Sequence, residues 1–312
     1  MPIVTFTDGH LPALLDFVET LNDWGQHGRE LGRKIFRELL DQPWLNLEGN
    51  CWILEVQGAV KGFCLVHREP PIGRAVLQME VDPSLAGGPL ERELLTIAVS
   101  QSRKWGAKIA HLCLPAGSSR SAMVEGYGFT LARSYTNMLW TEDQLPPWST
   151  ANGYHVRSFA PGDEELLTQA QNAAFSESWG FCPNTVEQIK YRADMSNTTH
   201  QGILFLFHRE EEPRREEPAG YCWTCLVPVS QGLRGIIGMI GVVPAFRGRG
   251  VSKSILLAGM DYLQTAGAGD IGLEVDSSNT PAIRLYDSVG FEKTSELHWF
   301  ELDLARLNTG NC

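Results

Sequence analysis

The sequence has no apolar run long enough to cross a membrane. Its longest apolar stretch covers only residues 235–246 and contains a proline, whereas a membrane-spanning helix needs about 20 predominantly apolar residues. The first four residues, Met-Pro-Ile-Val, carry no basic segment, so we expect no secretory signal peptide. Both absences argue against a membrane-spanning or exported protein.

Positive charge is also scarce. Lys and Arg number 26 against 37 Asp and Glu, which gives a formal net charge of −11. A surface of that sign repels phosphate backbones and anionic lipids. We therefore expect neither nucleic acid nor a membrane surface as a partner.

Cysteines are few and unpaired in pattern. An odd number, seven, is scattered along the chain, which predicts free thiols in the reducing cytoplasm rather than a disulfide framework. The one close pair, Cys222 and Cys225, lacks the second pair of ligands that a zinc site requires. It lies in a predicted strand, where residues three apart point to opposite faces. We expect two half-buried thiols and no bound metal.

The length of 312 residues suits two domains rather than one. With 43% hydrophobic and 20% charged residues, the composition excludes a disordered or fibrous chain. A faint internal repeat indicates two copies of one domain. Gly-Phe-Cys at residues 62–64 recurs as Gly-Tyr-Cys at residues 220–222, and Gly-Phe at residues 128–129 recurs at residues 290–291.

Hydrophobic periodicity and turn residues give both copies the same order of elements: helices first, then a meander of strands, then strand, helix, strand, helix and strand. We predict an α+β fold of two tandem domains, each a mixed, mostly antiparallel sheet flanked by helices. The predicted domains are residues 1–146 and 150–312, since tandem prolines at 146 and 147 stop regular structure. The charged, proline-rich residues 210–218 predict a solvated loop.

The most informative segment is a glycine-rich turn between a predicted strand and a predicted helix, within residues 235–253. Unpaired backbone N–H groups at such a helix start bind anions. Arg247, Arg249 and Lys253 place three cations there in an acidic protein. Lys253 in the first helical turn opposes the helix dipole, and a bound polyanion would remove that conflict.

Three phosphate-binding motifs compete for this turn. A P-loop would need glycines where Arg247 and Ser252 stand, and a Rossmann fingerprint would need its third glycine at Ser254. The pattern Arg/Gln-x-x-Gly-x-Gly/Ala fits residues 247–252 except for a serine at the last position. The turn thus resembles motif A of the GNAT acetyltransferase superfamily, whose backbone amides hold the pyrophosphate of acetyl-CoA. A basic turn without a ligand is the alternative.

A second match follows at residues 273–291. They fit the GNAT pattern L-x-V-x-x-x-N-x-x-A-x-x-L-Y-x-x-x-G-F at every fixed position. The resemblance implies acetyl-CoA as co-substrate. The residues that it implies around acetyl-CoA are Val242, Val243, Arg247, Gly248, Arg249, Gly250, Ser252, Lys253 and Asn279.

The same resemblance implies the reacting groups. An amine must be neutral to attack a thioester, a base takes its proton, and an acid protonates the leaving thiolate. Tyr286 is implied as the acid, with plain helix packing as the alternative. Glu274 is implied as the base, because its spacing to Tyr286 is similar to the base–acid spacing of the family's ribosomal-protein alanine acetyltransferases. A structural carboxylate is the alternative, and Glu177 is a rival base. Asn279 equally suits the N-cap of the next helix.

The loop at residues 172–183 resembles that of tandem GNAT proteins of the mycothiol synthase type. In GNAT folds this loop helps to wall the acceptor site. We predict that Glu177 and Trp179 hold a cationic amine by charge and by ring face. The alternative is that Trp179 and Phe181 pack under the sheet.

The first copy repeats the scaffold without these groups. Alignment on the repeat places Pro89, which has no N–H to donate, where the turn of the second copy has Gly250. Glu91 stands opposite Ser252 and would repel phosphate, and Val124 stands opposite Tyr286. We expect that this copy does not bind acetyl-CoA in the usual way.

Together these patterns predict a cytoplasmic acetyl-CoA-dependent N-acetyltransferase, active in the second copy only. It is expected to acetylate a primary amine by direct attack, on a small molecule first and a protein N-terminus second. One alternative is a non-catalytic acyl-CoA-binding sensor or partner-binding module on the same scaffold. A narrower alternative is an acetyltransferase similar to mycothiol synthase.

Overall fold

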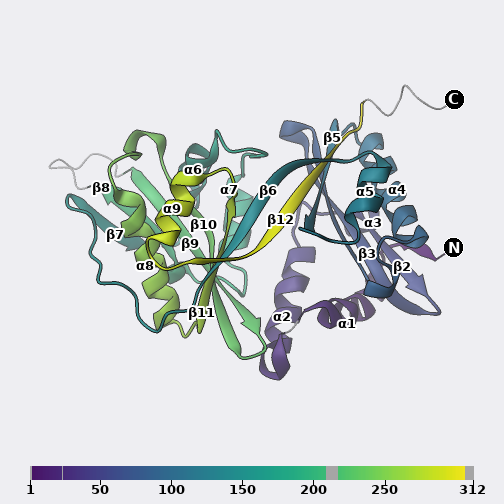
Figure 1. Ribbon diagram of the computed structural model, residues 1–312, viewed down its shortest axis with the longest axis horizontal. Helices are drawn as coiled ribbons and strands as arrows, with labels where there is room; N and C mark the ends of the chain where they lie inside the picture. Colours follow the sequence, from purple (N-terminus) through teal and green to yellow (C-terminus); the bar gives the residue numbers. More distant parts are fainter. Residues whose placement is uncertain (1, 23, 209–216, 306–312) are drawn as a thin grey trace.

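The structure, a computed structural model, describes residues 2–22, 24–208 and 217–305. In these residues every strand joins one twelve-stranded sheet, in the order β1-β2-β3-β4-β5-β12-β6-β11-β10-β9-β8-β7, which spans the molecule (Figure 1). Within it, β4 pairs with β5 and β10 with β11 in parallel, and the other pairs are antiparallel. The predicted mixed, mostly antiparallel sheet is confirmed. No described helix is long and apolar enough to cross a membrane.

The first half of the chain begins with a short strand and two helices and ends with a long strand. A tight turn with positive φ at Gln57 and Gly58 joins its first hairpin. Its elements are β1 (Ile3–Thr5), α1 (Leu11–Leu21), α2 (Gly25–Leu40), α3 (Leu47–Asn50), β2 (Cys51–Val56), β3 (Ala59–Glu69), β4 (Arg74–Val81), α4 (Pro89–Lys104), β5 (Ile109–Pro115), α5 (Ser121–Tyr127) and β6 (Thr130–Trp140).

The second half repeats this order, apart from the short helix α3. Residues 141–153 between the halves contain no helix or strand. The elements are β7 (Tyr154–Ser158), α6 (Glu164–Phe175), α7 (Val186–Ala193), β8 (Ile203–His208), β9 (Pro218–Val229), β10 (Gly232–Val242), α8 (Val251–Thr265), β11 (Asp270–Asp276), α9 (Thr280–Asp287) and β12 (Glu292–Asp303).

The last strand of each half lies in the other half of the sheet. β12 pairs with β5, and β6 pairs with β11, while β6 and β12 pair with each other at the centre (Figure 1). The strand order therefore reads the same from both ends when the two halves are interchanged. Each half of the sheet thus contains a strand from the other half of the chain: β12 lies beside β5, and β6 lies beside β11. The domain boundary at residues 146–150 describes the repeat in the sequence and stays a prediction.

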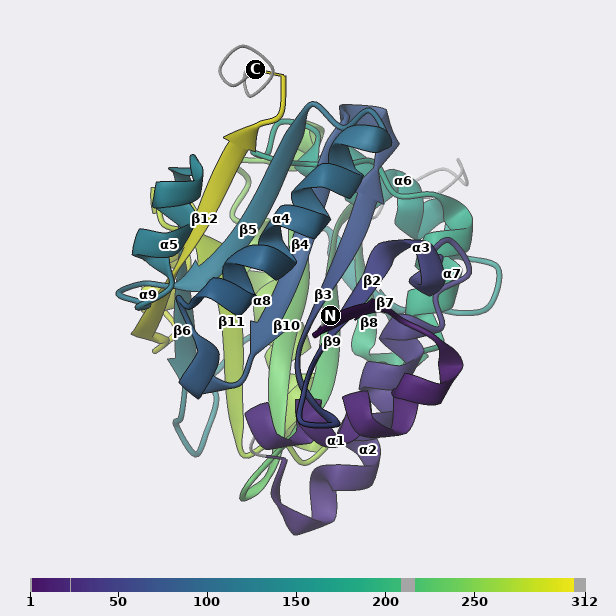
Figure 2. The same cartoon turned by 90° about the vertical axis from the view of Figure 1, so that its right-hand side faces the viewer.

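Helices cover both faces of the sheet. Successive side chains of a strand point to opposite faces, so apolar side chains form a core on each side. In β4 the buried residues are every second one, from Ala75 to Val81. α4 lies across one face (Figure 2) over a core that includes Leu94 and Leu112. α1 and α2 pack on the other face around Phe63. In the second half α8 and α9 share a core, and α6 and α7 form the opposite one.

The prediction of two half-buried thiols is right for Cys225 and wrong for Cys222, which core packing buries completely. Cys222 is buried in the core under α8, whereas Cys225 is half-buried and packs against the core on the opposite face. The six described cysteines are free. The predicted loop at residues 210–218 lies almost wholly outside the described residues.

Candidate active site

The glycine turn between β10 and α8 has the conformation that motif A requires. Gly248 and Gly250 have φ values of +77° and +73°, in the left-handed region that favours glycine. A Cβ atom added to either would meet no atom within 4 Å. The turn therefore faces open space at the positive end of α8, as an anion site does.

The structure places the first basic residue of the turn away from that space. Arg247 Nη1 pairs with Glu177 Oε2 at 2.8 Å, and its Nη2 donates to the Ala174 carbonyl at 2.8 Å. The Val243 N–H donates to the Ala219 carbonyl at 2.9 Å. The Arg247 side chain thus ties the turn to the end of α6, and Val243 is held by the sheet.

The remaining predicted phosphate contacts lie around the turn. Arg249 donates to the Ala245 carbonyl at 3.0 Å, and its guanidinium stands 5.1 Å from the ring centroid of Phe246. Lys253 is exposed on the first turn of α8, and Ser252 is half-buried beside it. Two cations are therefore available without an ion-pair partner in the described ranges.

Strands β10 and β11 separate at the end of β10 that leads to this turn. Their parallel pairing runs only from Arg234 opposite Asp270 to Ile237 opposite Leu273. The next residue, Gly238, is the extra residue of a bulge against β9, and a bulge bends its strand. Beyond it the backbone N–H and C=O groups of β10 on that side are free of β11.

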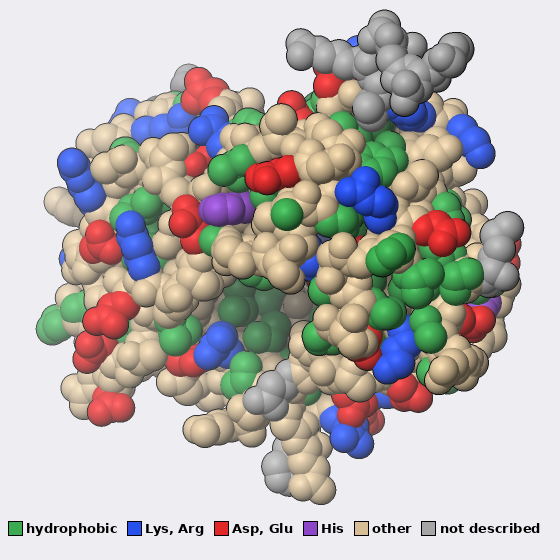
Figure 3. Space-filling view, turned by 45° about the vertical axis from the view of Figure 1, so that its right-hand side comes forward, with side chains coloured by type: hydrophobic (Ala, Val, Ile, Leu, Met, Phe, Trp, Pro, Cys, Tyr) green, Lys and Arg blue, Asp and Glu red, His purple; other side chains and the backbone are tan. Residues whose placement is uncertain are grey.

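A cleft of about 890 Å³ opens at this separation. Its walls come from both halves of the chain. Arg74, Arg133 and Tyr135 belong to the first half, and Glu274 and Tyr286 to the second. The space-filling view shows a face that is hollowed near its centre, with hydrophobic side chains on the floor (Figure 3).

The two predicted reacting groups line this cleft. Tyr286 in α9 is only 6% exposed and meets Phe291 edge to face at 5.9 Å, and burial raises the pKa of its phenol. No described residue forms a hydrogen bond with its hydroxyl. Glu274 points to the opposite side of β11 from Leu273 and Val275, which lie in the core. Its carboxyl is open to the cleft, and the surrounding protein raises its pKa by desolvation.

Asn279 serves as the N-cap of α9. Its side-chain oxygen accepts a hydrogen bond from the Ala282 N–H at 3.2 Å. The residue also borders the cleft, so its amide nitrogen remains available there. The capping interpretation is confirmed, and the role toward acetyl-CoA stays a prediction.

The loop after α6 contributes differently from what the sequence predicts for an amine site. Glu177 is highly exposed and is paired with Arg247. Trp179 stacks on His111 with centroids 4.8 Å apart and an interplanar angle of 13°, and Trp299 lies edge-on to it at 6.3 Å. The structure thus packs Trp179 against the sheet while leaving it in the cleft wall. Contact of either residue with an amine stays a prediction.

Sequence reasoning missed the first-half residues of the cleft. Tyr135 lies opposite Asp276 across the β6–β11 pair. Arg133 reaches the Asp276 carboxylate at 3.9 Å and Ser278 Oγ at 3.5 Å. The exchange of β6 and β12 brings Arg133 and Tyr135 to the cleft, and no local sequence pattern predicts that exchange. Gln171 was missed as well; its Oε1 is buried and has no partner among the described residues.

The equivalent turn of the first half is closed by its own side chains. Glu91 is fully buried and accepts a hydrogen bond from the Gly87 N–H at 2.6 Å. Arg120 pairs with it at 2.5 Å and donates to the Met79 carbonyl at 2.7 Å. A carboxylate thus occupies the place where the second half offers an open turn.

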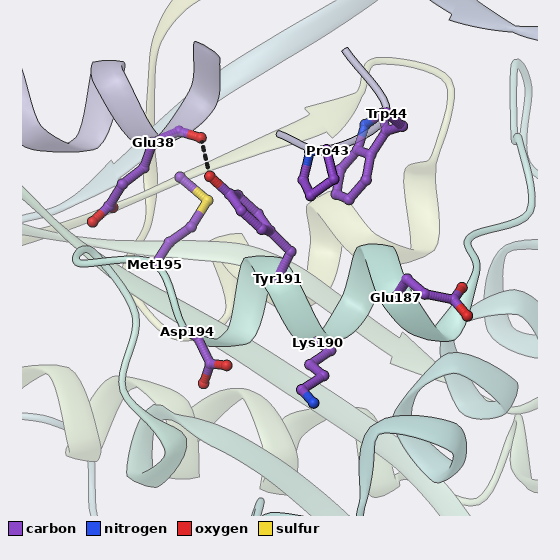
Figure 4. Close-up of a pocket in the computed structure, with 8 residues that line it drawn as sticks. All are labelled: Glu38, Pro43, Trp44, Glu187, Lys190, Tyr191, Asp194 and Met195. Atoms are coloured by element: carbon purple, nitrogen blue, oxygen red, sulfur yellow. Dashed lines mark hydrogen bonds between the residues drawn. The ribbon is translucent and has the colours of Figure 1, made fainter. Parts of the chain in front are cut away.

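A second, smaller depression lies between the halves and shares Met195 with the cleft. It has a volume of about 470 Å³ and is bordered by α7 and the end of α2. The Tyr191 hydroxyl donates to the Glu38 carbonyl at 2.7 Å, and Trp44 meets the Tyr191 ring edge to face (Figure 4). These contacts join the halves, and none of them carries an acid, base or nucleophile of the cleft. Among the described residues no group of His, Cys, Asp and Glu is arranged to hold a metal ion.

Comparison with known proteins agrees with this geometry. A sequence profile described as "Acetyltransferase (GNAT) family" matches residues 165–291. The chain is 32% identical to a mycothiol acetyltransferase of Thermobispora bispora over 74% of this chain and 76% of that protein. It is 30% identical to a mycothiol acetyltransferase of Rhodococcus opacus over 73% of each.

Two solved structures have the same fold. A GCN5-related N-acetyltransferase from Sphaerobacter thermophilus superposes with a TM-score of 0.72 at 20% identity, covering 97% of this chain and 95% of that one. A tandem GNAT protein from the clavulanic acid biosynthesis pathway superposes with a TM-score of 0.70 at 15% identity, covering 97% and 98%. At this identity the likeness speaks for the fold alone.

Proposed function

This chain belongs to the GNAT acetyltransferase family, and from that premise we propose that its second half transfers the acetyl group of acetyl-CoA to the primary amine of a small molecule. The observation that carries the proposal is the open glycine turn at the start of α8, continuous with the separation of β10 and β11. In the first half the same turn is occupied by Glu91, which supports a single active half.

The residues of the turn suit the pyrophosphate of acetyl-CoA. Backbone N–H groups from Gly248 to Ser252 supply donors at a helix start, and Arg249 and Lys253 add charge. Val242 ends the separated strand that leads to the turn, and Arg247 fixes the turn through Glu177. The role of Arg247 in this proposal is positioning through its side chain, with its backbone left to the ligand.

The cleft residues then divide the chemistry. Glu274 takes a proton from the ammonium form of the acceptor, and its raised pKa makes it a stronger base than an ordinary glutamate. The neutral amine forms a bond to the thioester carbon, and a free N–H of β10 near Gly238 stabilises the oxyanion. When the C–S bond breaks, Tyr286 protonates the thiolate, and the resulting phenolate takes up the second proton that the attacking nitrogen must lose to become the amide. Burial keeps the phenol protonated until that step.

The mycothiol acetyltransferase relatives support a narrower form of the proposal. In that form the chain acts as those relatives do, on the unacetylated form of mycothiol. This compound is included in the amine panel described below. Its turnover at least about tenfold faster than that of unrelated amines would support the narrower form.

Two measurements test the proposed reaction. Calorimetry with acetyl-CoA is expected to show one binding site per chain, and an absence of binding would contradict the proposal. Release of free CoA is then followed against a panel of primary amines. Tyr286→Phe is the catalytic control. Wild type and Tyr286→Phe that both bind acetyl-CoA and are equally inert would favour a sensor instead.

A further inference from the structure

The cleft contains an arginine that the proposed reaction does not use. Arg192 lies in the last turn of α7 and borders the cleft. Its Nη1 donates to Asn184 Oδ1 at 2.8 Å. Asn184 is fixed in turn by Asn172, through hydrogen bonds of 2.9 and 3.0 Å with its backbone N–H and C=O. A chain of hydrogen bonds therefore holds the guanidinium in one orientation before any ligand arrives.

The charge of this arginine is not neutralised by the protein. Across residues 2–22, 24–208 and 217–305, no carboxylate oxygen lies within 4.0 Å of its nitrogens. The nearest acidic influence, Glu69, is already ion-paired with Arg74. Burial lowers the pKa of the Arg192 guanidinium, so its charged form is poorly solvated here. A desolvated charge is costly unless an opposite charge accompanies it.

The position of Arg192 points to the acceptor as the missing partner. The same cleft holds Glu274 and Tyr286 where β10 and β11 separate, and Arg192 borders it from α7. Its volume of about 890 Å³ is of the size that takes a drug-sized ligand, far more than a short alkylamine fills. An acceptor whose amine reaches Glu274 has room to extend to Arg192.

We propose that the acceptor carries, besides its primary amine, an oxyanion group, which Arg192 binds as the specificity-determining residue of the cleft. A guanidinium matches both carboxylate and phosphate, with two parallel N–H donors. One donor is used by Asn184, and the others are left for the ligand. This inference rests on the proposed acetyl transfer, since it concerns the acceptor of that reaction, and it competes with the narrower form above, whose acceptor carries neither a carboxylate nor a phosphate.

Sets of three matched amines test the proposed role of Arg192. Each set contains an amino acid, the same compound with its carboxylate converted to a carboxamide, and the corresponding aminoalkyl phosphate. Wild type is expected to favour an anionic member over the carboxamide by about tenfold or more in kcat/KM, mainly through KM, because hydrogen bonds to charged groups are worth that much. The preferred anion identifies the oxyanion. Arg192→Gln is expected to lose the preference, and Arg192→Lys to keep part of it.

A neighbouring lysine provides the control. Lys190 lies on the same helix, exposed, on the side turned away from Tyr191 (Figure 4). Lys190→Gln removes the same charge outside the cleft and is expected to keep the wild-type preference. A wild type that prefers the carboxamide, or an Arg192→Gln variant that keeps the preference for the anion, would overturn the inference.

Thermal unfolding gives a readout that does not depend on turnover. Removing an unpaired, desolvated charge is expected to raise the Tm of Arg192→Gln by about 2 °C. Succinate or inorganic phosphate is expected to raise the Tm of wild type more than that of Arg192→Gln, since both proteins keep the open turn before α8 as a second anion site. A lower Tm in the variant, with equal shifts of the two proteins by either anion, would mean that Arg192 is structural and binds no anion. Failure of acetyl-CoA to bind would refute the proposed function separately, and the anion response would still decide this inference.

Discussion

The two halves have the same backbone arrangement and differ in the side chains at the equivalent turn. In both, a parallel strand pair of four residues opens toward a turn and a helix start. In the second half the turn is open and β10 is bulged at Gly238. In the first half Glu91 lies inside the turn, and β4 pairs with β3 without any shift of register.

The difference shows how an anion site is closed without changing the fold. A buried carboxylate with its arginine partner accepts the hydrogen bond of the Gly87 N–H, which would otherwise need a ligand. The two proposed reacting positions change in the same sense. Val124 replaces the tyrosine, and Cys113 has the register position of Glu274, with a thiol whose pKa burial raises to about 12. At these two positions the first half thus has neither a phenol nor a carboxylate.

The largest effect is expected from the phenol of the second half. Tyr286→Phe should lower kcat for acetyl transfer by about 10³-fold, because general acid catalysis is lost, with acetyl-CoA affinity retained. Tyr127→Phe removes a phenol from the equivalent helix α5 and should leave turnover as it is. Steady-state release of CoA measures the turnover of both variants. Equal rates for the two variants would contradict the proposal that only the second half is catalytic.

The next effect concerns the closed turn of the first half. Glu91→Gln leaves Arg120, whose side chain is 11% exposed, with only its longer ion pair to Glu80 at 3.5 Å, and should cost about 3 kcal/mol of unfolding free energy. Urea denaturation measures the loss. Ser252→Gln changes the register-equivalent position of the open turn and should cost less than 1 kcal/mol there. Similar costs at both positions would mean that Glu91 is not a structural anion.

A smaller effect follows from making the second half resemble the first. Ser252→Glu should raise the Kd for acetyl-CoA about 30-fold, roughly 2 kcal/mol, since its carboxylate competes for the N–H groups of the turn. Calorimetry measures this affinity. Ser252→Gln, similar in size and uncharged, should bind acetyl-CoA more tightly than Ser252→Glu; equal affinities would point to steric hindrance instead.

The smallest effect is on the pH profile. A general base works only when deprotonated, and desolvation raises the pKa of Glu274. The rate should therefore fall on acidification at a higher pH than for an ordinary glutamate. Glu274→Gln should abolish this acidic limb of kcat/KM, and Cys113→Ser should keep it. An acidic limb that survives in Glu274→Gln would assign the base elsewhere, with Glu177 the next residue to change.

Local patterns predicted the elements, because their causes are local. Period-two alternation in β4 and the glycine turn before α8 are read directly from neighbouring residues. The short strands β1 and β7 were missed, since three to five residues carry too little periodicity. The exchange of β6 and β12 was missed for a different reason: which strand pairs with which is decided by contacts between residues far apart in sequence.

The candidate site divides in the same way. Glu274 and Tyr286 belong to one motif, so the sequence predicted them together. Arg133 and Tyr135 enter the cleft only because β6 lies beside β11. Arg192 stands on a helix whose charged residues look alike in sequence, and only the packing shows that Arg192 faces the cleft and Lys190 does not.

The exchanged strands also set the order in which a nascent chain can finish folding. Both neighbours of β6, namely β11 and β12, are synthesised after it, and β5 obtains its second neighbour only when β12 leaves the ribosome. At about 5–20 residues per second this delay is on the order of ten seconds. For that time two strand edges at the centre of the future sheet stay unpaired and open to aggregation. The first half of the protein is therefore completed only after the whole second half, up to β12, has been translated.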